Sequence, residues 1–160
     1  MPVSIQITIT ITTDIGLIKL RHKISLYDPL VDNTFLLVNQ AICLPELNSI
    51  NTKDQLIIYA GFGVIDNNNT LPNWLQIGWN KILTITRNYI VAKPYPPGSG
   101  SGICWGDSGG PLYQYVNGKA ILIGIGKGGN GGCSNNQINM FFVKVTLYID
   151  WIIETVQNNN

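Results

Sequence analysis

Residues 102–112 carry the clearest chemical signal in the sequence. They read Gly-Ile-Cys-Trp-Gly-Asp-Ser-Gly-Gly-Pro-Leu, which places Ser108 among glycines and directly after an acid, Asp107. A serine hydroxyl on such a turn can act as a nucleophile, and the N–H groups of Gly106 and Ser108 can stabilise an oxyanion at one common point. The glycines permit positive φ angles and close approach of a substrate. The stretch therefore predicts a nucleophile loop; the alternative is a plain glycine-rich hairpin.

These eleven residues closely resemble the nucleophile segment of the trypsin-like serine proteases, which have the chymotrypsin fold. Residues 14–20 resemble the family's Asp-Ile-Ala-Leu-Leu-Lys-Leu, and residues 42–45 resemble its Ile-Cys-Leu-Pro. The resemblance implies one all-β protease domain built as a double barrel. Residues 1–45 would be the remnant of a truncated first barrel, and residues 46–160 would form a complete second barrel with a C-terminal helix. The chain would correspond to the C-terminal two-thirds of the domain.

The resemblance also implies a catalytic role for three positions. Ser108 would attack the substrate, Gly106 and Ser108 would form the oxyanion hole, and Asp14 would orient a catalytic histidine. Read locally, Asp14 could equally be a turn residue. The family's histidine lies well before this acid, in an Ala-Ala-His-Cys segment that is absent from these 160 residues.

The sequence contains one histidine, His22. It follows Asp14 beyond a strand of about six residues, which at about 3.3 Å per residue carries the chain roughly 20 Å away. We therefore expect His22 to be a solvated loop residue. Because a serine without a base is a poor nucleophile near neutral pH, the chain alone should be catalytically incompetent.

Asp107 should lack its usual partner as well. In the family, activation creates a new α-amino group that pairs with this acid, and the sequence does not begin with the corresponding Ile-Val-Gly-Gly. A buried carboxylate without a partner is costly. We therefore expect a zymogen-like loop with the oxyanion hole unformed.

The three cysteines leave one thiol without a partner, because their number is odd. The resemblance pairs Cys104 with Cys133 as a disulfide beside the specificity pocket. It leaves Cys43 free.

The specificity pocket departs most from the family. Gly102 stands where members that cleave after Lys or Arg carry an acid, Gly128 replaces a tryptophan, and Met140 replaces a glycine and should partly fill the pocket. Lys127 replaces a serine; its ammonium could reach Asp14 or could point into solvent. Together these changes imply a narrowed, apolar pocket or one no longer under catalytic use. The substrate-binding residues implied are Gly102, Ile103, Lys127, Gly128, Gly129 and Met140.

Hydrophobic periodicity predicts the elements that must position these residues. Alternation over residues 3–11 is typical of a half-buried strand. Asn117 and Gly118 predict a two-residue hairpin, and apolar spacing predicts a helix over residues 147–156. Further strands are expected at residues 56–59, 81–85, 88–92, 112–116, 120–125 and 141–145.

Composition limits the possible partners. Apolar residues make up 45% and charged residues 12%, which argues against disorder, and the net charge of +1 gives no indication of nucleic-acid or membrane binding. The start does not read as a signal peptide, whereas the sequon at Asn68 is usable only in the secretory pathway. We expect an extracellular protein with a protein or peptide substrate or partner and with neither cofactor nor metal. It is either part of a serine endopeptidase or a non-catalytic homologue that binds a protein partner.

Overall fold

A computed structural model describes residues 5–10, 14–22, 27–29, 35–37, 41–99, 102–130 and 139–159. The chain divides into two compact units, residues 1–42 and residues 43–160. Each unit is described by itself.

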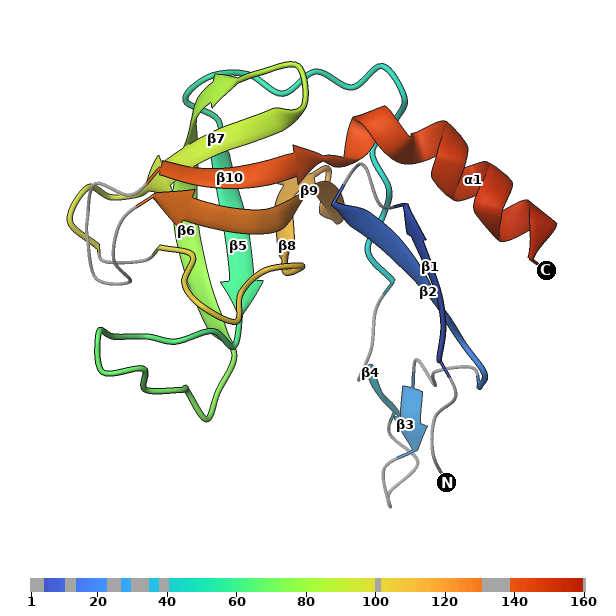
Figure 1. Cartoon of the computed structure of the whole chain (residues 1–160), viewed down its shortest axis with the longest axis horizontal. Coiled ribbons are helices and arrows are strands. Elements are labelled where there is room, and N and C mark those ends of the chain that lie inside the picture. Colours follow the sequence, from blue (N-terminus) through green and yellow to red (C-terminus); the bar gives the residue numbers. More distant parts are fainter. Residues whose placement is uncertain are drawn as a thin grey trace. The chain divides into compact units, whose positions relative to one another are not determined.

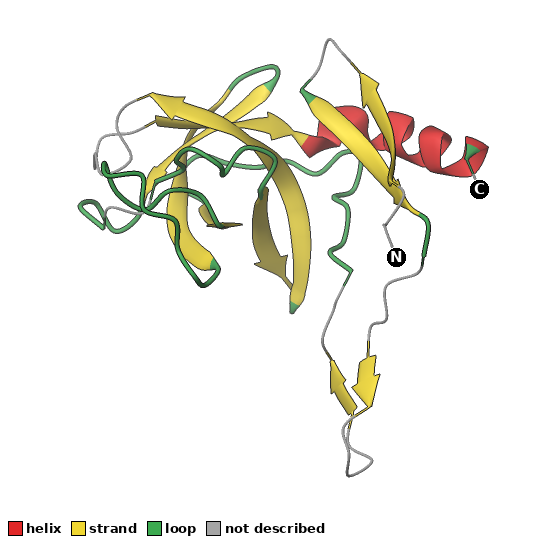
Figure 2. Cartoon of the chain, turned by 60° about the horizontal axis from the view of Figure 1, so that its bottom comes forward, coloured by secondary structure: helices red, strands yellow, loops and turns green. Residues whose placement is uncertain are grey.

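The second unit is built around a closed barrel of six strands in the order β10-β7-β6-β5-β8-β9 (Figures 1 and 2). Every neighbouring pair is antiparallel. The closed ring gives each strand two partners, so the barrel has no sheet edge along its paired length. The strands are β5 (Leu56–Gly61), β6 (Gln76–Ile85), β7 (Tyr89–Pro94), β8 (Pro111–Val116), β9 (Lys119–Asn130) and β10 (Asn139–Lys144).

The predicted hairpin between β8 and β9 is confirmed. Asn117 and Gly118 form its turn with φ angles of 50° and 76°, the positive values that such a two-residue connection requires. Strand β9 runs five residues beyond the predicted end at residue 125, to Asn130. Its glycine-rich second half lacks the apolar alternation from which the strand was predicted.

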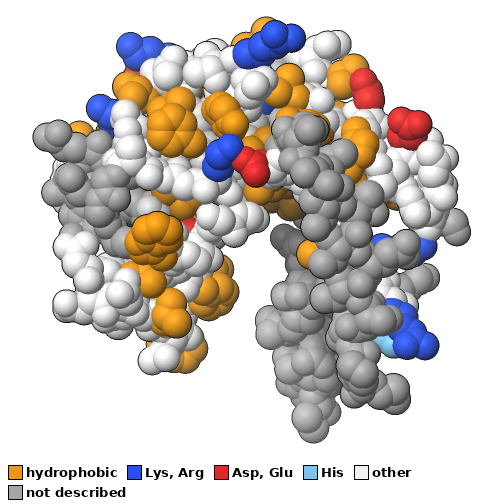
Figure 3. All heavy atoms as spheres, viewed as in Figure 1, with side chains coloured by type: hydrophobic (Ala, Val, Ile, Leu, Met, Phe, Trp, Pro, Cys, Tyr) orange, Lys and Arg blue, Asp and Glu red, His pale blue; other side chains and the backbone are white. Residues whose placement is uncertain are grey.

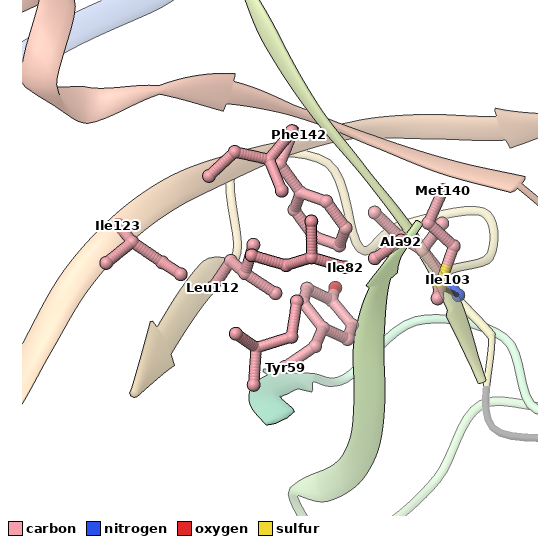
Figure 4. Packing of buried hydrophobic residues seen from close by; sticks show 10 residues of the cluster. Tyr59, Ile82, Ala92, Ile103, Leu112, Ile123, Met140 and Phe142 are labelled. Atoms are coloured by element: carbon pink, nitrogen blue, oxygen red, sulfur yellow. Dashed lines mark hydrogen bonds between the residues drawn. The ribbon is translucent and has the colours of Figure 1, made fainter. Parts of the chain in front are cut away.

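Apolar side chains from all six strands and from the nucleophile loop fill the barrel. Met140 and Phe142 alternate inward along β10 and are fully buried. The ring of Phe142 lies 5.7 Å from that of Tyr59, centroid to centroid (Figure 4). The cluster consists of Ile57, Tyr59, Ile82, Ile90, Ala92, Ile103, Leu112, Ile123, Met140 and Phe142.

The C-terminal helix is confirmed and begins slightly later than predicted. A short 3₁₀ turn (Val145–Tyr148) precedes α1 (Ile149–Asn158), whose buried face carries Ile149 and Ile152. Within the residues that the structure describes, no helix is both long enough and apolar enough to cross a membrane.

The first unit contains two separate antiparallel pairs. Strand β1 (Ile5–Thr10) pairs with β2 (Ile15–Leu20) over six residues, and β3 (Tyr27–Pro29) pairs with β4 (Phe35–Leu37) over three. Asp14 lies in the turn before β2 with φ of 53°. The expected all-β fold, with a complete second barrel, an incomplete first barrel and a C-terminal helix, is confirmed.

Candidate active site

The turn that carries Ser108 is joined to strand β9 at Gly126. Gly109 N–H donates to the Gly126 carbonyl at 2.8 Å, and Gly126 N–H donates to the Gly110 carbonyl at 2.8 Å. A Cβ at Gly126 would lie 2.9 Å from Ile103 Cδ1 and 3.1 Å from the Asp107 carbonyl oxygen. Glycine fits this close approach best, because a side chain here would have to displace the end of Ile103 and would crowd the Asp107 carbonyl.

A β-bulge in β9 brings Lys127 to this turn. Phe142 pairs with Gly126 and Phe141 with Gly128, so Lys127 is the extra residue of the bulge. Its carbonyl accepts a hydrogen bond from the exposed Ser108 Oγ at 3.2 Å. Bulges re-aim side chains and occur often beside active sites.

Asp107 is buried, and its carboxylate is fully engaged by the backbone. Oδ1 accepts the Gly63 N–H at 2.8 Å, and Oδ2 accepts the Cys104 N–H at 2.8 Å. A Cβ at Gly61 or Gly63 would collide with the carboxylate, so the two glycines make its cradle. The expectation that Asp107 would be buried without a partner is wrong, because backbone donors satisfy a carboxylate as a cation would.

Tyr59 holds the same turn from inside the barrel. Its hydroxyl donates to the Asp107 carbonyl oxygen at 2.9 Å, and the Gly110 N–H donates to that oxygen at 3.0 Å. Burial, and secondarily the neighbouring Asp107, raises the pKa of Tyr59. The phenol therefore stays protonated and remains a hydrogen-bond donor.

The two predicted oxyanion donors lie on this turn. Gly106 has φ of 92°, a conformation that favours glycine. Among the hydrogen bonds of the described residues, none uses the N–H of Gly106 or of Ser108. Because the Asp107 carbonyl belongs to the same peptide as the Ser108 N–H, the Tyr59 and Gly110 bonds also fix the direction of that N–H.

A cavity of about 130 Å³ adjoins Ser108, and four of the predicted binding residues line it together. These four are Ile103, Lys127, Gly128 and Gly129, and the remaining wall comes from Cys104 and Trp105.

Two other predicted binding residues lie elsewhere. Gly102 lines a separate cavity of about 240 Å³, together with Asp107, Tyr59, Gly61 and Gly63 among others. Met140 is fully buried in the barrel core and accepts the Ile103 N–H at its sulfur at 3.3 Å. Met140 thus touches the backbone of a wall residue of the Ser108 cavity without itself lining that cavity, and its filling of the pocket stays a prediction.

The remaining predicted residues are placed only within their own units. Asp14 and His22 belong to the first unit, where His22 is exposed after the end of β2. The pairing of Asp14 with Lys127 stays a prediction. Cys43 is a free, half-buried cysteine, and the Cys104–Cys133 bridge stays a prediction because Cys133 lies outside the described residues. No group of three or more His, Cys, Asp or Glu side chains in the described part could hold a metal ion.

Sequence reasoning missed the contribution of Tyr59, Gly61 and Gly63. They precede Asp107 by 44 to 48 residues. Tyr59 donates its hydroxyl, Gly63 donates its backbone N–H, and Gly61 and Gly63 leave room for the carboxylate because they have no side chain. The resemblance of residues 61–63 to the family's Gly-Trp-Gly was the one available signal.

Comparison with known proteins agrees with this geometry. The family described as Trypsin matches residues 5–152. Chymotrypsin-C of Bos taurus is 31% identical over 92% of this chain and 56% of its own length. Chymotrypsin-C of Rattus norvegicus is 33% identical over 90% of the chain and 55% of its length. Chymotrypsin-like elastase family member 1 of Canis lupus familiaris is 29% identical over 91% of this chain and 57% of its own length. The chain thus spans little more than half the length of these relatives, and it belongs to the trypsin family.

Proposed function

We propose that this chain is the nucleophile-bearing and peptide-binding part of a secreted serine endopeptidase. The observation that carries the proposal is that Ser108 lines a cavity of about 130 Å³. The turn that carries Ser108 is held by the Asp107 carboxylate, which accepts hydrogen bonds from the backbone N–H groups of Gly63 and Cys104. The 31% identity to a chymotrypsin-C supports a peptide as the ligand.

The residues have distinct roles in this proposal. In the whole endopeptidase, Ser108 Oγ attacks the carbonyl carbon of the scissile peptide bond, and the N–H groups of Gly106 and Ser108 stabilise the oxyanion that forms. Pairing of β8 with β9 ends at Ile125, so residues 127–130 extend beyond β8. An extended peptide can lie along this part of β9, with one side chain in the Ser108 cavity.

The chain as it stands is proposed to bind without cleaving. The attack needs a base to take the hydroxyl proton, and the one histidine, His22, is exposed at the end of a strand in the other unit. Asp14 would orient a histidine supplied from outside these residues.

Two properties accompany this proposal. A disulfide would join Cys104 to Cys133, which agrees with Cys43 being the free cysteine. Extracellular location is supported by the sequon at Asn68, which lies exposed in the loop between β5 and β6.

Binding and turnover measured on the full 160-residue chain test the proposal. Blocked alanine tetrapeptides that carry one Leu or Phe should bind, as measured by fluorescence anisotropy, whereas a peptide p-nitroanilide should not be hydrolysed above background. Ser108→Phe should abolish binding because its ring fills the cavity, and Ser49→Phe, at an exposed serine, should not. Binding that survives Ser108→Phe contradicts the site. Turnover that is lost in Ser108→Ala contradicts the predicted incompetence.

A non-catalytic protein-binding module is the second candidate. Apolar side chains of the barrel unit gather over the loop between β5 and β6 (Figure 3), where Trp74 is 80%, Leu71 66% and Phe62 58% exposed. Exposed apolar patches of this kind mark interaction sites. The transcript upstream of Met1 distinguishes the candidates: an in-frame Ile-Val-Gly-Gly and Ala-His-Cys favour the endopeptidase, and their absence from a complete transcript favours the binding module.

A further inference from the structure

A second hollow opens on the outer face of the barrel, where β7, β9 and β10 lie side by side. Its volume is about 320 Å³, and it is lined by Tyr89, Lys127, Gly128, Gly129 and Phe141. Because Met140 and Phe142 point into the core, Phe141 between them points outward.

The hollow occupies the place of a missing side chain. Phe141 lies directly opposite Gly128 in the pairing of β9 with β10. Opposed residues in a sheet normally have Cβ atoms about 4.5–5.5 Å apart and pack together. Gly128 has no side chain, and a Cβ built there would meet no atom of the described residues within 4 Å. Phe141 therefore presents an apolar wall to open space.

Lys127 adds a positive charge to this apolar site. Its ammonium nitrogen lies 3.2 Å from the Tyr89 hydroxyl oxygen and 5.1 Å from the centroid of the Tyr89 ring. This is within the range of a cation–π interaction, and the face of a second ring brought to the ammonium would be attracted in the same way.

The hollow and the cavity beside Ser108 share three wall residues. Lys127, Gly128 and Gly129 line both. A peptide that lies along residues 127–129 with one side chain beside Ser108 therefore passes the hollow, and it can place another side chain there.

We propose that this hollow binds an aromatic side chain of the peptide that occupies the Ser108 cavity. The inference rests on the proposed peptide-binding function and gives that site a second specificity determinant. The space suffices, because an apolar cavity of about 150 Å³ already holds benzene. Two walls are aromatic, and the ammonium favours a ring over an aliphatic group of equal size.

Two probes on the full chain test this proposal. The first is free indole, followed by NMR shifts of the amides of residues 89, 128 and 141. The second is a set of blocked alanine tetrapeptides with phenylalanine at each position in turn, paired with the same set carrying cyclohexylalanine. We expect indole to shift those amides and one phenylalanine peptide to bind about two- to fivefold more tightly than its cyclohexyl partner, the factor for an exposed cation–π contact.

Variants separate the contributions of charge and space. Lys127→Met should remove the preference for phenylalanine over cyclohexylalanine, whereas Lys119→Met, an exposed lysine at the other end of β9, should preserve it. Gly128→Trp should block indole by filling the hollow. Phe141→Ala removes a wall without altering the backbone at Gly128 and should weaken indole binding about three- to tenfold.

The outcomes distinguish this inference from the proposed function. Absence of indole binding, or equal binding of the two peptide sets, overturns the aromatic hollow even if the peptides bind at Ser108. Indole binding without binding of any tetrapeptide overturns the peptide occupant and the proposed function together. A preference for phenylalanine that survives Lys127→Met overturns the role of the ammonium.

Discussion

The two units of this chain are both β-structured, but within the described residues only the second closes its sheet. In the barrel unit each of six strands has two partners, and their inward side chains share one core. The first unit has two pairs of strands, the longer of six residues on each side. Among its described side chains at residues 14–22, Ile15 alone is buried.

This difference indicates where the site is built. A closed barrel can hold a strained turn in place, because the turn is hydrogen-bonded to strands that are themselves fixed. Ser108, Asp107 and both cavities near them belong to the barrel unit, whereas Asp14 and His22 belong to the first unit. A two-stranded pair alone is only marginally stable in water. We therefore expect the turn that carries Ser108 to be more stably folded than the strand pair that carries Asp14.

The largest effect that this comparison predicts is on the free energy of unfolding, when the same substitution is made in each unit. Ile82 is fully buried in the barrel, and Ile18 in β2 is 59% exposed. Ile82→Ala should lower the free energy of unfolding by about 2–5 kcal/mol, because it leaves a cavity in a packed core. Ile18→Ala should change it by about 0.5 kcal/mol or less.

Urea unfolding followed by circular dichroism measures both variants. A large loss for Ile18→Ala would contradict the comparison, since it would mean that β2 is packed as a core strand.

Sequence alone predicted the parts of the molecule whose signals are local. The Asn117–Gly118 turn fixes the β8–β9 hairpin, and the glycine-flanked Ser108 marks the nucleophile turn. The partners of Asp107 could not be predicted, because backbone N–H groups occur at every non-proline residue and only folding selects those of Gly63 and Cys104.

Met140 shows how much position in a family can predict and what it leaves open. The resemblance expects a side chain that partly fills the pocket, and this stays a prediction; the structure buries the side chain in the core with its sulfur on the N–H of Ile103, a wall residue of the Ser108 cavity. The inward alternation of Met140 and Phe142 along β10 places the side chain there.

A smaller change in the free energy of unfolding is expected from a substitution at Tyr59, inside the barrel. Tyr59→Phe keeps the ring beside Phe142 and removes the hydroxyl that donates to the Asp107 carbonyl. Unfolding free energy should fall by about 1 kcal/mol, the net value of one hydrogen bond, because Gly110 still donates to that oxygen. Tyr115→Phe, at a tyrosine that is 63% exposed, should have no measurable effect.

Thermal unfolding gives the stability, and the amide proton shifts of Gly106 and Ser108 give the orientation of the turn. Shifts that are unchanged in Tyr59→Phe would show that the hydroxyl does not position these donors.

The smallest effect on stability is expected at residues 66–70 of the loop between β5 and β6, which lie outside the barrel's strand pairing and are joined by local hydrogen bonds. Asp66 Oδ1 accepts the N–H of Asn68 at 2.9 Å and that of Thr70 at 3.0 Å. Hydrogen bonding from Thr70, first from its backbone, lowers the pKa of Asp66 below its ordinary value. The folded state therefore favours the carboxylate. The stability that the carboxylate contributes is complete above the unfolded pKa of about 3.9 and is lost as the pH falls through the lower folded value.

Asp66→Asn keeps an acceptor but no charge. The urea midpoint of this variant should be slightly below that of the wild type at pH 7 and should converge with it on acidification. Glu154→Gln, at an exposed position on α1, supplies the matched control. A deficit that persists unchanged below the folded pKa would mean that the loop depends on the shape of the Asp66 side chain and not on its charge.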